Sequence, residues 1–595
     1  MSRDKNVDSN KSVLSESIAP ELLPQATSIS RRQFLGGVTG AAGAAMLSGS
    51  AFGADTVGQS HRWDLETDVL VVGSGAAGSC AALYARNGGA EVMLIERASY
   101  YGGTTQKSQG AYWIPNNSLM RARGLTDDRL DALKYMVRLS FPTLYQPTHP
   151  TLGLSQAQFD LIATYFDNGS RVVDELATMD VLQSTFFQGL DGTDFPDYYA
   201  HIDENKSPIG RILIPEDSDG RPGFGDELIR QLQAGVDKAG VTVHLNSRAE
   251  RLMLDSQGAV VGLSYRNADD QLTSVRARKG VVFGSGGFIH NPQMRLDYLR
   301  GPVYGGCTVA GATGDFVTMG ASAGAALGNM NNAWWAQILL EHAIVDSAVA
   351  MNVFVPPGDS MIQVNRYGKR FVNEKFVYNE RSQAHFVWDA PRAEYPNLFS
   401  FLIYDSQVDE QFAGVFPIPA GHAAYLLKAE SLETLAEVIA RRLTELSAHT
   451  GGYTLDGEFA ENLAATVTKF NGFADQGVDP EFHRGEVPSE LFFNNFYTPP
   501  GHQSDQPNPT MRRFAEQGPY YAMILAPGVL DTKGGPKINP NGQVLDNYDQ
   551  PIEGLYGAGN CIAAPAAQAY WSAGATIGAA MIFGALAGTH AAQKS

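Results

Sequence analysis

The feature that most constrains this chain is a glycine-spaced turn that follows an apolar, β-branched run at residues 67–78. The run TDVLVV leads into Gly73, Gly75 and Gly78 in the spacing G-x-G-x-x-G, and a small-residue helix pattern follows. The first glycine allows a tight strand-to-helix turn, the second lets backbone approach a pyrophosphate, and the third lets helix and strand pack closely. A phosphate there meets the positive end of the helix dipole. The stretch therefore predicts a dinucleotide-binding strand, turn and helix.

A second apolar run, GAEVMLIE, ends at Glu96, about 20 residues beyond the third glycine, where an acid can hold a ribose hydroxyl. Residues 99–115 then supply glycines and hydroxyl side chains, typical of a loop that wraps a flat ligand and its phosphates. A glycine-rich turn without a nucleotide is the alternative. The cofactor contacts expected from this part of the chain are Gly73, Gly75, Ala76, Ala77, Gly78, Glu96, Arg97, Gly103, Thr104, Thr105, Ser108 and Gly110.

Length and composition bound the remaining choices. With 595 residues the chain exceeds one usual core, so two domains or one domain with an insertion are expected. The formal net charge of −19 is poorly suited to nucleic acids or anionic membranes as partners. Cys80, Cys307 and Cys561 are far apart and form neither a C-x-x-C pair nor a C-x-x-C-H motif, which excludes covalent c-type haem.

Residues 1–54 are predicted to lie outside the fold. Residues 1–29 are polar without a sustained apolar period, which indicates disorder. The sequence SRRQFL at 30–35 precedes a weakly apolar Gly/Ala segment and SAFGA at 50–54, as in a twin-arginine signal with a cleavage region. We therefore expect export to the periplasm or the cell exterior; a cytoplasmic protein with a chance Arg-Arg pair is the alternative.

The order of elements predicts an α/β protein. Apolar spacing predicts a helix over 156–178 and another over 226–239 that leads into the strand VTVHLNS. Two further segments read as a β-meander that ends in GSGG at 284–287. This order is typical of a Rossmann-like flavin-binding domain rather than a nicotinamide-binding one.

From about residue 329 the chain becomes more aromatic and mixed in charge, which predicts an inserted α+β cap domain at 341–528. The flavin-binding domain would then comprise 55–340 and 529–595. Its second part contains GVLDTKGGPKINPNGQVL, read as a strand pair with an Asn-Gly turn. It ends in a helix from Gly574 onward that is apolar for about 15 residues, too short and glycine-rich for a membrane span. We expect that helix to pack on the sheet with its N-terminus aimed at the cofactor.

Five motifs make the chain resemble the fumarate reductase/3-ketosteroid dehydrogenase flavoprotein superfamily. Beyond the first fingerprint these are YGGTTQKSQG at 101–110, GSGGF at 284–288, RFVNE at 370–374, TKGG at 532–535 and GLYGAGN at 554–560. The resemblance covers about residues 62–590 and implies FAD as the cofactor, with the cap selecting the substrate. It adds Gly286, Gly559, Asn560, Ala575 and Ile577 to the expected cofactor contacts.

Two positions separate the branches of this superfamily. In fumarate reductases an arginine four residues after the RFVNE glutamate donates the proton, and this chain has Tyr378 there. The segment CIAAPAAQAYWSAGATIG after GAGN contains neither arginine nor histidine. A dicarboxylate site needs fixed cations to offset desolvation of two carboxylates, so the sequence disfavours succinate or fumarate as substrate.

The same positions are similar to those of 3-ketosteroid Δ1-dehydrogenases. Such enzymes have a tyrosine at the position of Tyr378, a Y-x-x-x-G loop matching Tyr570 and Gly574, and a loop like FPDYY, whose first tyrosine is Tyr198. They also have a segment like VDPEFHRGE at 478–486. The loop YWSAG departs from their usual pattern, and its Tyr-x-Ser is similar to Δ4-(5α)-ketosteroid dehydrogenases.

The resemblance implies 1,2-dehydrogenation of a 3-ketosteroid, with a proton leaving C2 and a hydride leaving C1 for flavin N5. Tyr570 and the Gly574 N–H would bind the carbonyl oxygen, since two such donors stabilise an enolate. Tyr378 would be the base, and because a phenol is a weak base at neutral pH, Tyr198 would support its phenolate by a hydrogen bond. A glycine at 574 would also leave room for the substrate.

Several alternatives stay open. A flavin ene-reductase of the fumarate reductase type or a non-catalytic flavin carrier would use the same fold. The predicted partners are a small apolar ketone and an electron acceptor that the sequence does not identify. Arg381 is expected to form a salt bridge in the cap, and His483 to hold a turn. Trp334 and Trp335 are expected to line the pocket or pack in the core.

Overall fold

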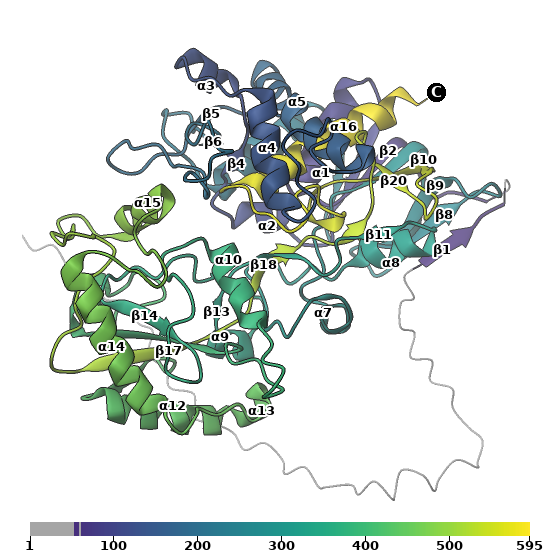
Figure 1. Cartoon of the computed structure of the whole chain (residues 1–595). Coiled ribbons are helices and arrows are strands. Elements are labelled where there is room, and N and C mark those ends of the chain that lie inside the picture. The colour runs from purple at the N-terminus through teal and green to yellow at the C-terminus, as the bar shows by residue number, and fades with distance from the viewer. Residues whose placement is uncertain (1–52, 59–60, 595) are drawn as a thin grey trace, which may run out of the picture. The chain divides into compact units, whose positions relative to one another are not determined.

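The computed structural model describes residues 53–58 and 61–594 (Figure 1). The predicted disordered tail and twin-arginine motif lie outside the described residues, so both stay predictions. Gly53 and Ala54, which the sequence placed in the signal region, instead begin strand β1 (Gly53–Thr56) and pair with Arg251 and Leu252. The fold therefore starts before the predicted boundary at residue 55.

A nine-stranded sheet forms the larger part of the fold. Its parallel centre places β10 beside β2, β2 beside β3 and β3 beside β7, while β21 joins β10 from the other side, also in parallel. Strands β8, β9 and β10 form the predicted antiparallel meander. Besides β1, the strands are β2 (Leu65–Val72), β3 (Val92–Ile95), β7 (Thr242–His244), β8 (Arg248–Leu254), β9 (Val260–Arg266), β10 (Leu272–Phe283), β20 (Gln543–Leu545) and β21 (Pro551–Gly557).

Helix α1 (Ala76–Asn87) follows β2 directly and packs against the last helix, α16 (Ala575–Gln593), as Figure 1 shows. A Cβ at Gly584 would lie 2.3 Å from the Ala77 carbonyl oxygen, so the two helices touch backbone to backbone there. Among the described residues, α16 alone is long and apolar enough to cross a membrane, and most of it is buried inside the protein. Its predicted packing in the flavin-binding part is confirmed.

The helices predicted from apolar spacing are present. Helix α5 spans Gln156–Thr178, as predicted, and α6 (Gly225–Lys238) begins one residue earlier than expected. The segment between β5 and β6 contains no regular helix or strand apart from an isolated bridge, as its Gly, Asp and Pro content predicts. The other short elements on this side are α2 (Gly103–Gln106), β4 (Tyr112–Trp113), α3 (Ser118–Ala122), α4 (Arg129–Ser140), β5 (Ser184–Phe186), β6 (Ile212–Pro215), α7 (Pro292–Tyr298) and α8 (Asp315–Ser322).

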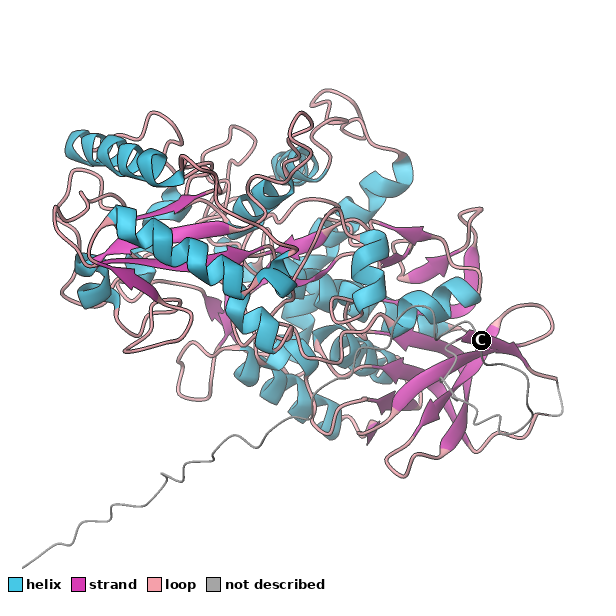
Figure 2. Cartoon of the chain, turned by 90° about the horizontal axis from the view of Figure 1, so that it is seen from below, coloured by secondary structure: helices cyan, strands magenta, loops and turns pink. Residues whose placement is uncertain are grey.

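The cap is built on a second, five-stranded antiparallel sheet, visible beside the larger sheet in Figure 2. Its first strand, β13, starts at Ile338 rather than at the predicted residue 341, because it pairs with β17 at the far end of the insertion. The cap elements are β13 (Ile338–Leu339), α9 (Leu340–Val345), β14 (Met361–Val364), α10 (Tyr378–Gln383), β15 (Ser400–Asp405), α11 (Ser406–Phe412), β16 (Leu427–Ala429), α12 (Leu432–Glu445), α13 (Ser447–Thr450), α14 (Phe459–Gln476), α15 (Pro488–Tyr497) and β17 (Tyr520–Ala526).

The strand pair with an Asn-Gly turn predicted for residues 528–545 is confirmed only around the turn, and the strands before it pair elsewhere. Strand β18 (Val529–Thr532) pairs with β12 (Ala333–Trp335), and β19 (Gly535–Pro536) pairs with β11 (Leu327–Gly328). Around the Asn-Gly turn Ile538 forms an antiparallel bridge with Val544, and two backbone hydrogen bonds link residues 537–539 with 543–545. Strand β20 also pairs with β21. The chain enters and leaves the cap side by side, and these buried segments satisfy their backbone groups with each other.

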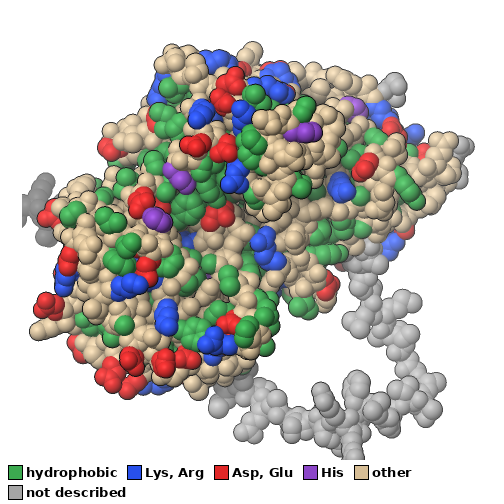
Figure 3. Space-filling model, viewed as in Figure 1, with side chains coloured by type: hydrophobic (Ala, Val, Ile, Leu, Met, Phe, Trp, Pro, Cys, Tyr) green, Lys and Arg blue, Asp and Glu red, His purple; other side chains and the backbone are tan. Residues whose placement is uncertain are grey.

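Surface charge is unevenly spread. Figure 3 shows acidic side chains gathered at the lower edge of the visible face, over α12, whose sequence includes Glu433, Glu437 and Glu445. Basic side chains on the same face lie mostly singly among acidic and apolar ones. This distribution accords with the acidic net charge of −19.

Candidate active site

A cavity of about 780 Å³ runs from the N-terminus of α1 and the carboxyl ends of β2, β3 and β10 to the cap. Crevices at this end of a parallel sheet are where dinucleotides bind. Of the 21 residues predicted for the site, all but Gly78 and Ala575 line the cavity. Gly78 serves packing instead, because a Cβ there would lie 1.8 Å from the Gly73 carbonyl oxygen. Ala575 is fully buried in the first turn of α16.

Three buried tyrosines meet at the end of the cavity that the cap covers. Tyr198 comes from the irregular loop before β6, Tyr378 is the first residue of α10, and Tyr570 lies in the loop before α16. The hydroxyl oxygens of Tyr198 and Tyr378 are 2.7 Å apart. The ring of Tyr570 lies 5.4 Å from that of Tyr198 and 5.7 Å from that of Tyr378, both edge to face. Residues almost 400 positions apart in sequence thus converge on one point.

The Tyr570 hydroxyl and the Gly574 backbone lie within hydrogen-bonding reach of each other. Burial raises the pKa of Tyr570, and hydrogen bonds from Tyr378, Thr576 and the Gly574 backbone partly offset that rise. Gly574 is the N-cap of α16, so its N–H belongs to a helix start, where the dipole favours negative charge. A carbonyl oxygen that enters between them would meet two donors.

Gly574 is required for a reason that differs from the predicted one. Its φ of 86° lies in the left-handed region, and a Cβ would sit 2.6 Å from the Cα of Tyr112. The sequence indicated that a side chain here would block the substrate. The structure shows that it would instead collide with the backbone of residues 111–112. The glycine therefore lets α16 begin directly against β4.

Comparison with known proteins identifies the family. The family model described as "FAD binding domain" matches residues 68–577. The chain is 32% identical to the 3-oxosteroid 1-dehydrogenase of Mycolicibacterium smegmatis, over 88% of this chain and 96% of that protein. It is 30% identical to the enzyme of the same name from Mycobacterium tuberculosis (strain H37Rv), over 89% of this chain and 99% of that one.

The chain belongs to the 3-oxosteroid 1-dehydrogenase family of FAD-dependent oxidoreductases. A solved structure agrees: the 3-ketosteroid delta1-dehydrogenase of Sterolibacterium denitrificans, in complex with 1,4-androstadiene-3,17-dione, matches with a TM-score of 0.73 at 26% identity. The match covers 89% of this chain and 99% of that one.

The residues that line the other end of the cavity fit the FAD of this family. Glu96 is buried and accepts hydrogen bonds from the Ser74 backbone and hydroxyl, at 3.0 and 2.7 Å, which fixes its carboxylate beside the glycine turn. At Gly73 and Gly284 a Cβ would lie 2.6 and 2.7 Å from neighbouring backbone, so the turn has no room for side chains. When bound, FAD supplies a hydride acceptor.

The three tyrosines lie in apolar surroundings. Burial raises the pKa of Tyr198 and of Tyr378 well above the usual value. The rings packed against the three tyrosines include Phe195, Phe354, Phe493 and Trp334, at centroid distances of 4.8–6.2 Å. A phenolate in such surroundings depends on hydrogen bonds for stabilisation.

Two charged residues outside this cluster, Arg381 and His483, have structural roles. The salt bridge predicted for Arg381 was wrong: its guanidinium donates to the Gln337 side chain and to the carbonyls of Glu374, Val353 and Phe354. The carboxylate of Glu374 pairs with Arg370 and Arg484 instead. His483 lies at an exposed turn with a φ of 56° and pairs with Glu486.

Both tryptophans pack in the core. Trp334 is 1% exposed and lies behind Tyr570, and its Nε1 donates to the Asn560 side chain at 3.0 Å. Lys533, also buried, holds its ammonium 3.9 Å from the centre of the Trp334 ring. Neither tryptophan lines the cavity.

Sequence reasoning missed much of the cavity wall. Aromatic residues of α15 line it beside the tyrosines, and their only signal was the aromatic-rich segment LFFNNFY. Asp531 also lines it; burial raises its pKa to about 6, although the N–H groups of Gly287 and Thr532 donate to it. The α15 residues that line the cavity are Phe493, Phe496 and Tyr497. Cys307, Met351 and Phe354 line it as well and were also not predicted.

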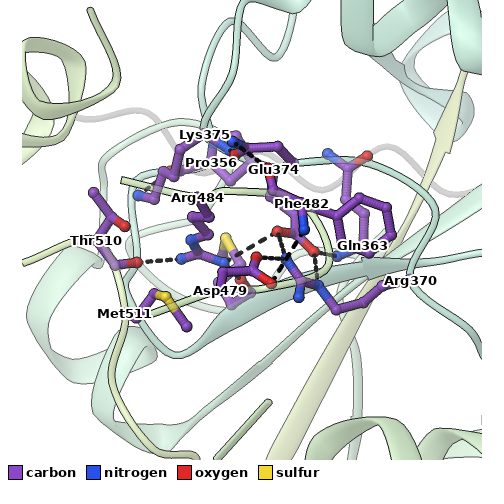
Figure 4. A network of polar contacts seen from close by, with 12 residues as sticks. Pro356, Gln363, Arg370, Glu374, Lys375, Asp479, Phe482, Arg484, Thr510 and Met511 are labelled. Carbon is purple, nitrogen blue, oxygen red and sulfur yellow. Dashed lines mark hydrogen bonds and ion pairs between the residues drawn. The ribbon is translucent and has the colours of Figure 1, made fainter. Parts of the chain in front are cut away.

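A buried ionic network surrounds Arg370 and Glu374, a few residues before Tyr378 in the chain (Figure 4). Arg370 pairs with Glu374 and Asp479 at 2.7 and 2.8 Å, and Arg484 pairs with Glu374 at 3.3 Å. Lys375 donates to the Pro356 carbonyl at 2.7 Å. Burial would raise the pKa of Glu374, but the two arginines outweigh burial and hold it below its usual value. The RFVNE motif therefore fastens the cap.

Proposed function

We propose that this protein oxidises the bond between carbons 1 and 2 of 3-ketosteroids, with FAD as the hydride acceptor. The observation that carries the proposal is the convergence of Tyr378, Tyr570 and Gly574 at the cap end of the cavity. The relatives described above, which are 3-oxosteroid 1-dehydrogenases by name, support it.

Each residue has one task in this reaction. The Tyr570 hydroxyl and the Gly574 N–H donate to the ketone oxygen and stabilise negative charge as it develops there, and one such donor typically contributes about 3 kcal/mol. This makes the neighbouring C2–H acidic. The Tyr378 oxygen takes the C2 proton, and the electron pair of the broken C2–H bond forms the C1–C2 double bond as a hydride leaves C1. The Tyr198 hydroxyl, 2.7 Å away, donates to the Tyr378 oxygen while it carries negative charge.

The surroundings favour a neutral, flat, apolar ketone. Aromatic rings surround the tyrosines, and hydroxyl groups and one N–H are the polar groups that converge there. A dicarboxylate would lose its hydration at this point without gaining arginine partners at the positions used by fumarate reductases. The ene-reductase alternative is therefore disfavoured.

Turnover with a steroid tests the proposal directly. The purified holoenzyme is mixed with 4-androstene-3,17-dione and an artificial acceptor, with succinate as the control substrate. We expect acceptor bleaching with the steroid only, and a product lighter by two hydrogens whose NMR spectrum shows a 1,2 double bond. No turnover with any 3-ketosteroid would overturn the proposal. A 4,5 double bond formed from a 5α-steroid would reassign the bond.

We further propose that the protein is exported by the twin-arginine pathway. The support is the SRRQFL sequence at 30–35 with its weakly apolar continuation. Replacing Arg31 and Arg32 together by lysine should retain the protein in the cytoplasm of its host, as measured by cell fractionation. An unchanged distribution would contradict export by this route.

A further inference from the structure

The hydrogen bond between Tyr198 and Tyr378 joins two distant segments. Tyr198 belongs to the loop that precedes β6 in the flavin-binding part, and Tyr378 belongs to the cap. Helix α15 (Pro488–Tyr497) contacts both segments with neighbouring residues. The separation of the two hydroxyls therefore depends on how α15 holds each one.

One set of contacts joins α15 to the Tyr198 loop. The Ser489 hydroxyl donates to the Tyr198 carbonyl oxygen at 3.0 Å, and both residues are 1% exposed. The Phe492 ring stacks on Phe195 with centroids 4.3 Å apart and planes at 11°. Phe195 in turn lies beside the Tyr198 ring, at 6.2 Å. The Ser489 hydrogen bond and the Phe492 stacking contact therefore both hold the loop that carries Tyr198.

A second set joins α15 to the turn that leads into α10. Glu490, which is fully buried, accepts a hydrogen bond from the Asn373 amide at 2.8 Å. The side-chain oxygen of Asn373, Oδ1, accepts hydrogen bonds from the backbone N–H groups of Lys375 and Phe376, at 3.0 and 3.2 Å. Asn373 thus fixes the turn from which Tyr378 emerges. Adjacent residues of one helix hold the two tyrosine segments.

We propose that Ser489, Glu490 and Phe492 form a clamp, called here the α15 clamp, that sets the distance between the Tyr198 and Tyr378 hydroxyls. The proposal rests on the proposed function, because it concerns the base of that reaction. Phe492 does not line the cavity, whereas its neighbour Phe493 does. Ser489 and Phe492 are therefore positioning residues that act through Tyr198 without touching substrate.

Substitutions at the clamp should slow catalysis without weakening substrate binding. Ser489→Ala removes one buried hydrogen bond, so we expect kcat to fall about 3- to 10-fold, with KM and FAD content unchanged. Phe492→Leu should act in the same direction. Asn495→Ala is the matched control, because Asn495 lies on the same helix but is exposed. Should Ser489→Ala fold poorly, Ser489→Cys keeps the size of the side chain and loses the strong donor.

A double-mutant cycle separates positioning from general destabilisation. If Ser489 acts through Tyr198, then Ser489→Ala in a Tyr198→Phe background should change kcat by less than about 2-fold, because the hydroxyl it positions is already gone. An equal loss in both backgrounds would overturn the clamp. So would the same loss in Asn495→Ala.

The clamp can also be tested apart from the proposed function. Any ketone that the wild-type enzyme oxidises serves for the cycle, so a failure with steroids leaves the cycle intact. Without any turnover, the readout is chymotrypsin cleavage at Tyr198–Tyr199 in the holoenzyme. Cleavage should be faster in Ser489→Ala and Phe492→Leu than in wild type or Asn495→Ala, because the loop opens more often. Equal cleavage rates would overturn the proposal.

Discussion

The segment 370–381 faces two different environments. Toward the cap sheet, Arg370 and Glu374 belong to a buried ionic network that contains two further charged partners, Asp479 and Arg484. Toward the cavity, Tyr378 is surrounded by aromatic rings and by two more tyrosine hydroxyls. The charged side chain of Glu374 and the hydroxyl of Tyr378 are therefore only four positions apart in the chain.

The two environments have different roles. Buried charges that are fully paired hold a unique arrangement but tolerate no loss of a partner. Hydroxyls leave the reacting end of the cavity free of fixed charge, which suits a neutral ketone that becomes negative only during reaction. Substitutions on the ionic side should therefore change stability, and substitutions on the tyrosine side should change rates.

Tyr378→Phe should have the largest effect. Loss of a general base costs about 100- to 10,000-fold in kcat, while FAD binding and folding should be unchanged. Burial raises the pKa of Tyr378, so most of its hydroxyl is protonated at neutral pH. The phenolate fraction grows as pH rises, and wild-type kcat should therefore increase with pH. Steady-state rates from neutral to alkaline pH test both points. A variant with wild-type rates would remove Tyr378 from the mechanism.

Glu374→Gln tests the ionic side. It leaves Arg370 and Arg484 without their shared carboxylate, so the free energy of unfolding should fall by about 3–5 kcal/mol. Since the pKa of Glu374 is held below its usual value, its stabilising contribution is complete above the usual glutamate value of about 4.3 and is lost as pH falls through the lowered one. Urea unfolding measures this. Asp389→Asn, which breaks the surface pair with Arg392, is the control and should change little.

Tyr570→Phe removes one of the two donors to the ketone oxygen. We expect kcat to fall about 100- to 1,000-fold, with thermal stability close to that of wild type. Stopped-flow reduction of the bound flavin by substrate measures the step directly. A change in KM alone would show that Tyr570 binds the ketone without stabilising the enolate.

His483→Asn should have the smallest effect. His483 is exposed and does not line the cavity, and asparagine tolerates its φ of 56°. Rates and stability should match wild type. A clear loss of turnover would mean that the ionic side of the segment contributes to the chemistry, and the division described above would fail.

Local sequence rules predicted the parts that local physics determines. The glycines at 73 and 78 mark the cofactor turn because close backbone contact leaves no room for a side chain there. The apolar spacing of 156–178 likewise predicts the bounds of α5. The tyrosines were found through resemblance to a family, since nothing in a lone tyrosine distinguishes it from a core residue.

Contacts between residues far apart in the chain could not be predicted from the sequence. Whether Arg381 meets a carboxylate depends on which arginines reach Glu374 first, and the distant Arg484 is one of them. The partners of β18 and β19 depend on how the chain crosses into the cap and returns. The wall formed by α15 likewise requires a helix from the far end of the cap to reach the Tyr198 loop.

The contact between α1 and α16 has a consequence for the order in which the protein matures. The cavity needs Gly73–Ala77 from one end of the chain and Gly559, Asn560 and Ile577 from the other. A ribosome must therefore release nearly all the chain before the cofactor pocket is complete. FAD then loads onto a finished polypeptide, and a truncated product that lacks α16 should emerge from synthesis colourless.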